Sequence, residues 1–177
     1  AAAGELFAEH GVDDVTTQQI ADAADIGAGT LFLYAKTKGE LLLLVQNSHY
    51  SEALERGQAA AAPLTDPVDA VMAIVRPIVE CNRVQVDNGR TYLREMVFGD
   101  SSEPRHAAAL AIVAETEAAM AETIARLTPV TGDDAATAAR IVSAAMVISM
   151  ATGADRSATT DDILGDIRRQ VSVLLTR

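Results

Sequence analysis

The stretch Thr16–Leu44 most constrains the fold, because it reads as two short helices about a tight turn, followed by a longer helix. Thr16 and Gln19 have the T-x-x-Q spacing of a capping box, in which each side chain satisfies an unpaired helix amide. Asp25-Ile26-Gly27 supplies the turn, since aspartate tolerates a left-handed backbone better than most residues. A second helix is expected over residues 28 to about 34. This arrangement is a helix-turn-helix, whose second helix can enter a major groove.

The helix after this motif begins with Thr37 as its N-cap and Lys38 in its first turn. A lysine there opposes the helix macrodipole, which favours anions at this end. A bound phosphate would remove the conflict, because amides and ammonium would then share one anion. The alternative is a solvated surface lysine, but the position directly after a helix-turn-helix favours phosphate contact.

These residues resemble the TetR family of bacterial transcriptional repressors over about the first 50 positions. The family pattern appears here as His10-Gly11, Thr16-Thr17, Ile20-Ala21, Gly29-Thr30-Leu31-Phe32 and Thr37-Lys38-Gly39-Glu40-Leu41. Gly27 departs from the family's usual serine cap, and Leu33 replaces a position that often carries a polar or aromatic reader. The resemblance implies a homodimer that binds a palindromic operator in double-stranded DNA and is released by a small molecule.

On this resemblance, two sets of residues are expected at the DNA surface. The backbone of DNA would be contacted by Thr17, Gln18, Tyr34 and Lys38. Base edges would be faced by Ala28, Gly29, Thr30 and Leu33, and a thymine methyl would suit Ala28 or Leu33.

Net charge argues against simple DNA binding, since the chain carries −11 and residues 1–50 hold seven acids against two lysines. The chain begins partway into the family pattern, so we expect a basic N-terminal arm to be missing from these residues. No apolar run of about eighteen residues and no secretory signal are seen, which predicts no membrane partner. A single cysteine excludes an internal disulfide and suits a cytoplasmic protein.

Abundant alanine and scarce aromatic residues favour closely packed helices, so the predicted class is all-α. We place a helix-turn-helix domain over residues 1–49 and a larger helical domain for ligand binding and dimerisation over residues 50–177. A helix beginning at Pro67 carries an apolar stripe as far as Val86, with a kink expected at Pro77. Gly89 is expected to separate it from a short helix over Thr91–Phe98.

The chain shows no phosphate-binding glycine loop, nucleophile elbow or paired-carboxylate signature, which predicts neither enzymatic activity nor a cofactor. Its three histidines are scattered, so no metal site is expected. Cys81 continues an apolar stripe, and a buried small side chain is favoured over a redox sensor. A mostly apolar effector pocket is expected instead, with ordinary core as the alternative for each residue. Its candidate lining is Met72, Val75, Arg76, Val79, Tyr92, Arg94, Met96 and Met120.

The helix around Ile141–Met150 is apolar on nearly every side, so it must be covered on every side. Together with the stripe of the last helix, it predicts a four-helix interface about a two-fold axis. The expected interface residues are Ile141, Ala144, Ala145, Ile148, Ile167, Val171 and Leu174. An alternative to the repressor is a helical ligand-binding dimer whose degenerate head no longer recognises an operator.

Overall fold

The computed structural model describes residues 2–100, 102–152 and 158–176. Within these residues the chain is helical and contains no strand, which confirms the all-α class. The helices in chain order are α1 (Ala2–His10), α2 (Thr17–Ala23), α3 (Ala28–Leu31), α4 (Lys38–Ala61), α5 (Pro67–Arg83), α6 (Val86–Phe98), α7 (Pro104–Leu127), α8 (Gly132–Thr152) and α9 (Thr160–Leu175).

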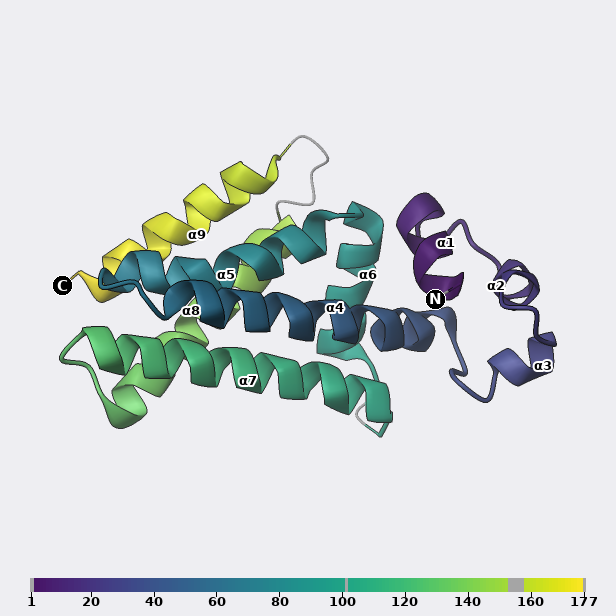
Figure 1. Cartoon of the computed structure of the whole chain (residues 1–177), viewed down its shortest axis with the longest axis horizontal. Coiled ribbons are helices and arrows are strands. Elements are labelled where there is room, and N and C mark those ends of the chain that lie inside the picture. The colour runs from purple at the N-terminus through teal and green to yellow at the C-terminus, as the bar shows by residue number, and fades with distance from the viewer. Residues whose placement is uncertain (1, 101, 153–157, 177) are drawn as a thin grey trace.

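The molecule is elongated, with α1, α2 and α3 forming a head at one end (Figure 1). The long helix α4 begins in this head and continues into a body built from α5 to α9, and the C-terminus lies at the far end. Buried hydrophobic residues form one cluster that extends from Phe7 in the head to Val171 in α9. Because head and body share this cluster, the boundary at residue 49 stays a prediction.

Local capping signals place the helices where the sequence predicts them. The Thr16 hydroxyl accepts from the Gln19 amide while the Gln19 side chain accepts from the Thr16 amide, which completes the capping box. Thr37 caps α4 through the Glu40 amide. Asp25 has a φ of 53°, so the turn after α2 uses the left-handed backbone expected there.

Two helix boundaries differ from the sequence prediction. Helix α3 ends at Leu31, because the amides of Leu33 and Tyr34 bond to carbonyls three residues back and tighten the chain into turns. Gly89 does not separate two helices but lies inside α6. A Cβ at this glycine would lie 2.2 Å from the Asn82 carbonyl oxygen, so Gly89 permits α6 to pack directly on the end of α5.

Helices α4 and α5 approach closely where Gly57 faces Ile74. A Cβ at Gly57 would lie 2.8 Å from the Ile74 Cα and 3.1 Å from the Ala73 carbonyl oxygen. That carbonyl cannot receive the usual helix hydrogen bond, because residue 77 is proline and has no amide hydrogen. Helix α5 nevertheless runs through Pro77 without interruption.

By length and composition, helix α8 is long and apolar enough to cross a membrane. This corrects the expectation that the chain has no apolar run of that length. Such a run is weak evidence for a membrane span, because core helices of soluble proteins satisfy the same criterion. Only 39% of its apolar window is buried inside the chain, so part of α8 presents an uncovered apolar surface.

Candidate functional site

The turn after α3 carries the most exposed apolar side chains of the head. Leu33 is 83% exposed, and Phe32 and Tyr34 beside it are each at least half exposed. Leu31 points inward and is buried, so the three residues that follow it are directed to solvent. An exposed apolar patch of this kind at the tip of a molecule marks a contact surface.

The predicted base-reading residues lie on or beside this patch. Gly29, Thr30 and Leu33 are exposed, and Ala28 is partly exposed. No atom lies within 4 Å of the position that a Cβ on Gly29 would take, so the backbone here is open to a close partner. Phe32 is absent from the predicted set. The sequence could have indicated Phe32, because it stands directly between the buried Leu31 and the predicted base-reading residue Leu33.

The predicted contacts from α2 lie at its first turn. Thr17 is partly exposed, and Gln18 is exposed with its amide donating to the Asp22 carboxylate at 2.7 Å. Helix N-termini attract phosphate because their first amides have no partner within the helix. Thr17 and Gln18 therefore remain candidates for DNA backbone contact.

Lys38 has a different role from the predicted one. Its ammonium donates to the carbonyl oxygens of Val12, Asp13 and Val15 at 2.9, 3.1 and 3.0 Å. An ammonium group has three protons, so these bonds use all of its donors. Lys38 ties the α1–α2 loop to the first turn of α4, and we remove it from the expected phosphate contacts.

Lys36 is the other lysine of the head, and sequence reasoning did not select it. Its side chain is 80% exposed, with the ammonium 3.4 Å from a carboxylate oxygen of Glu103 at the start of α7. Glu103 is nearly buried and also lies 3.7 Å from the Arg105 guanidinium. Since Arg105 would still neutralise Glu103, Lys36 is free to exchange this partner for a phosphate.

Head and body are joined by a buried side chain, Asn88 of α6. Its carbonyl oxygen accepts from the Val12 amide at 2.7 Å, and its amide nitrogen donates to the Phe7 carbonyl at 2.7 Å. One bond therefore reaches α1 at Phe7, and the other reaches the loop after α1 at Val12. A movement of α6 would therefore be transmitted to the head through Asn88.

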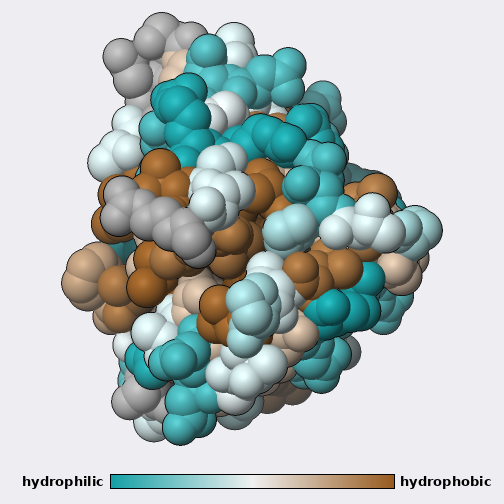
Figure 2. Space-filling view, turned by 90° about the vertical axis from the view of Figure 1, so that its left-hand side faces the viewer, coloured by the Kyte–Doolittle hydropathy of each residue, from teal (hydrophilic) through white to brown (hydrophobic). Residues whose placement is uncertain are grey.

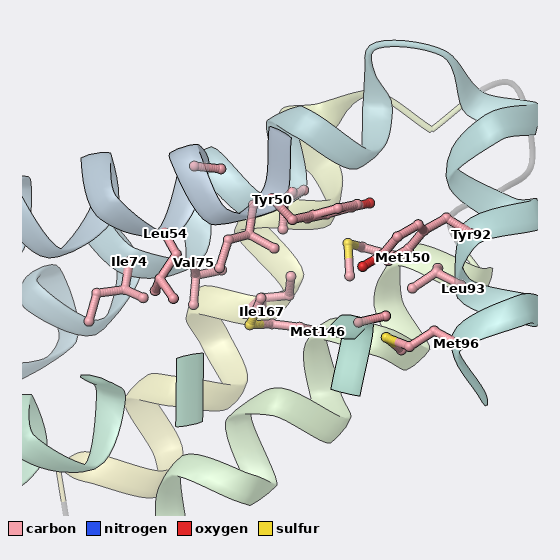
Figure 3. Packing of buried hydrophobic residues seen from close by; sticks show 14 of the residues in the cluster. Tyr50, Leu54, Ile74, Val75, Tyr92, Leu93, Met96, Met146, Met150 and Ile167 are labelled. Carbon is pink, nitrogen blue, oxygen red and sulfur yellow. The ribbon is translucent and has the colours of Figure 1, made fainter. Parts of the chain in front are cut away.

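A small apolar cavity of about 50 Å³ lies in the body between α4, α5, α6, α7 and α8. The Tyr50 and Tyr92 rings stack over it with centroids 4.4 Å apart, and methionine side chains approach from α6 and α8 (Figure 3). Burial raises the pKa of both tyrosines, which keeps them neutral. The lining residues are Tyr50, Ile78, Tyr92, Leu93, Met96, Ile112, Val113, Thr116, Ser143, Met146, Val147 and Met150.

This cavity contains only two of the eight predicted ligand-binding residues, Tyr92 and Met96. Val75, Val79 and Met120 are fully buried in the core and do not line this cavity. Met72 and Arg76 line a separate groove between α4, α5 and α9, and Arg94 lines a hollow outside the cavity. The apolar stripe of α5 identifies buried positions, but periodicity does not show which of them border an empty space.

An uncovered apolar face runs along α8 and α9. Ile141 and Ile148 of α8 and Val173 of α9 are 50%, 62% and 58% exposed, and Ala144 between the isoleucines is also exposed. Figure 2 views the end of the molecule that carries the C-terminus and shows hydrophobic residues gathered between hydrophilic margins.

Two predicted interface residues do not belong to this face. Ile167 and Val171 are buried within the chain, so they cannot meet a second subunit, and Val173 takes their place at the surface. Ala145 and Leu174 are partly exposed at its edge. The error has a simple cause, because α9 carries apolar residues on both sides and only packing decides which side faces the body.

The described residues contain no group of three metal-ligating side chains close enough to hold an ion. Cys81 is partly buried, and burial raises the pKa of its thiol to about 11. The thiol is therefore protonated near neutral pH, which favours a packing role over a reactive one.

Comparison with known proteins matches residues 1–45 to the family described as "Bacterial regulatory proteins, tetR family". No curated protein matches the chain by sequence. The family match covers the head and the first turns of α4, which are the elements that carry the exposed patch and the capping box.

Solved structures match almost the whole chain. Thermus thermophilus FadR, a TetR family repressor in complex with lauroyl-CoA, has a TM-score of 0.77 at 23% identity over 98% of this chain and 90% of its own. A TetR regulator from Rhodococcus sp. RHA1 has a TM-score of 0.74 at 18% identity over 99% and 92%. A TetR/AcrR family regulator from Thermobifida fusca has 0.68 at 22% identity over 96% and 92%. At these identities the likeness shows the fold.

Proposed function

We propose that this chain, whose head belongs to the tetR family of bacterial regulatory proteins and whose fold is that of TetR regulators, is a cytoplasmic transcriptional repressor. It binds a palindromic operator as a homodimer and is released by a small-molecule effector. The observation that carries the proposal is the open patch at Phe32–Tyr34, which lies beside a capped helix-turn-helix at the tip of the molecule. We assign no reaction to the chain.

On DNA, the residues of the head divide into two groups. Ala28, Gly29, Thr30 and Leu33 face base edges, while Thr17, Gln18 and Tyr34 contact the backbone. Because Phe32 is exposed, we add it to the residues that face base edges. Because the Lys36 ammonium is exposed, we add Lys36 to the residues that contact the DNA backbone.

Lys36 and Lys38 are expected to respond differently to neutral replacement. Lys36→Gln removes one phosphate contact, so the slope of log affinity against log salt should fall by about one unit per head. Lys38→Met should weaken binding by loosening the α1–α2 loop while leaving that slope unchanged. Fluorescence anisotropy with one operator duplex at several salt concentrations measures both. A reduced slope for Lys38→Met alone would return Lys38 to the phosphate-binding set.

The homodimer would form through the α8–α9 face. Two copies of the stripe Ile141, Ala144 and Ile148, related by a two-fold axis, would cover each other and complete a four-helix interface. Such an axis places two recognition elements in successive major grooves about 34–36 Å apart, which requires a palindromic operator.

The effector would bind in the cavity beneath Tyr50 and Tyr92. The likeness to FadR, solved with lauroyl-CoA, supports a small-molecule ligand within a fold of this kind. A ligand shifts the protein only through its different affinity for the two states. A typical coupling of about 1–3 kcal/mol would lower operator affinity roughly 5- to 150-fold.

Asn88 should be required for this coupling. Asn88→Ala leaves the Val12 amide and the Phe7 carbonyl without their buried partner, which should cost about 2–4 kcal/mol of unfolding free energy. Operator affinity should then depend less on effector, even when the effector still binds. Chemical denaturation and anisotropy measure the two effects. The control is Ser48→Ala, which removes an exposed bond to Glu52 and should change neither.

A gel shift against the DNA flanking the protein's own gene tests the proposal directly. A shifted palindromic fragment, competed by itself and not by a scrambled duplex, is the expected result. A dimer that binds ligand yet shifts no fragment would favour the helical ligand-binding protein with a degenerate head. Two observations favour this alternative: the head is acidic, and the Lys38 ammonium is bonded to carbonyl oxygens of the chain itself.

A further inference from the structure

The apolar cavity has a neighbour on the outside of the body. A hollow of about 300 Å³ lies between α6 and α8, and it shares two wall residues, Leu93 and Val147, with the cavity. These two side chains therefore belong to the walls of both the small apolar cavity and the larger outer hollow. The outer hollow is the only one of the two that carries charge, through Arg90 and Arg94.

We propose that this pair of spaces is a single binding site for an anionic amphiphile, an organic anion with an unbranched apolar tail. The anionic group lies at Arg90 and Arg94, and the tail passes between Leu93 and Val147 into the cavity. The inference names the chemical class of the effector, and its role in regulation rests on the proposed function.

The two arginines are suited to hold one anion. They stand four residues apart on α6, which places them one turn apart on the same face of the helix. Within the described residues, Arg90 has no hydrogen bond or ion pair, and Arg94 is paired only with its chain neighbour Glu95 at 3.4 Å. Guanidinium groups bind carboxylate and phosphate with several parallel hydrogen bonds, so two of them favour an anionic head group.

The inner cavity is suited to a hydrocarbon tail. Aliphatic, methionine and aromatic side chains dominate its lining, and none of the lining residues is charged. The Thr116 hydroxyl is already used, since it donates to the Ile112 carbonyl at 2.8 Å. A charged group placed inside would lose its hydration without gaining a partner, so the charge must remain outside.

The cavity can also adapt to its occupant. At about 50 Å³ it is small, but Met96, Met146 and Met150 form part of its wall (Figure 3). Methionine is unbranched and flexible, so these side chains can change rotamer to lengthen the space along a tail. The outer hollow is continuous with the proposed dimer face through Ile148, so a bound ligand would lie beside the subunit interface.

Binding of three probes to the full chain tests the site without DNA. Titration calorimetry is run with decanoate, with 1-decanol, which has the same tail and no charge, and with butyrate, which has the charge and almost no tail. Decanoate should bind about tenfold more tightly than decanol, as expected for two partly exposed ion pairs, and butyrate should not bind measurably.

Variants test separately the contact of the anionic group with the two arginines and the passage of the tail between Leu93 and Val147. Arg90→Gln with Arg94→Gln should abolish the preference for decanoate over decanol, while Arg56→Gln on the exposed side of α4 should retain it. Val147→Trp should block the passage and remove binding of both long probes, with circular dichroism showing that the variant is folded. If that variant does not fold, the arginine pair still decides the matter.

Several results would overturn the site. They are equal affinity for decanoate and decanol in the unchanged protein, an undiminished preference in the arginine double variant, or no decanoate binding below its micelle concentration. Operator release is measured separately by anisotropy. Decanoate that binds with the predicted selectivity yet leaves operator affinity unchanged would uphold the site and contradict the effector role.

Discussion

Ile141→Glu is expected to convert the protein into monomers and to abolish operator binding without changing the head. Ile141 is 50% exposed in the single chain, so a glutamate there can remain hydrated and the monomer should fold normally. In the proposed dimer the same position is buried. The two-fold axis would then place two unpaired carboxylates in an apolar interface.

The expected penalty is large compared with the stability of a dimer. Leaving a buried charge without a partner costs about 3–5 kcal/mol, and the symmetric interface would contain two such charges. Because both heads must bind together to span two grooves, a monomer should lose at least about 100-fold in operator affinity.

Sedimentation velocity measures the assembly, and anisotropy measures operator binding. The matched control is Val84→Glu, which also adds a glutamate at an exposed valine but lies away from the α8–α9 face. It should remain dimeric and bind the operator. An intact Ile141→Glu dimer would move the interface to another surface.

Gly89→Ala is expected to destabilise the body strongly. The new Cβ would lie 2.2 Å from the Asn82 carbonyl oxygen and 2.9 Å from the Asn82 amide nitrogen. Asn82 cannot move aside easily, because it is buried and its amide donates to the Tyr50 hydroxyl at 2.8 Å and the Gly89 carbonyl at 3.3 Å. Helix α6 must therefore shift away from α5 and carry Tyr92 with it.

Overpacking of this kind costs about 1–3 kcal/mol or more, and we expect the upper end here because the clash is with backbone. The higher helix propensity of alanine returns only about 1 kcal/mol. The net loss is then about 2 kcal/mol, so the midpoint of thermal unfolding should fall by roughly 4–8 °C, and ligand binding beneath Tyr92 should weaken.

The same substitution in α9 provides the control. A Cβ at Gly165 would have its nearest atom, a guanidinium nitrogen of Arg169, at 3.8 Å, which is ordinary contact. Gly165→Ala should therefore raise stability by about 0.5–1 kcal/mol through helix propensity. A thermal midpoint that rises for both variants would show that α5 and α6 are not packed as closely as Gly89 requires.

Signals that act between neighbours in the chain were sufficient to predict most of the fold. The Thr16–Gln19 capping box and the cap at Thr37 both form as predicted. Asp25 takes the left-handed backbone expected in the turn. Each of these features depends on hydrogen bonds or dihedral preferences within a few residues, so the sequence contains all of the partners.

Features that depend on residues far apart in the chain could not be predicted from such local signals. Lys38 binds carbonyls 23 to 26 positions earlier, and Asn88 bonds to residues 76 and 81 positions away. A lysine at a helix start is compatible both with phosphate and with internal carbonyls. Only the approach of the α1–α2 loop decides between them.

The same division applies to the apolar residues. By itself the sequence determined that α5 and α9 have apolar stripes and that α8 is apolar on nearly every side, because the pattern of apolar residues is a property of one helix. The tertiary structure decided that Ile167 and Val171 face the core while Ile141, Ile148 and Val173 remain uncovered, and that the cavity lies beside Tyr92 and Met96 and not beside Val75 and Val79. The physical reason is that burial and empty space depend on how several helices pack together, and no single stretch of chain specifies that arrangement.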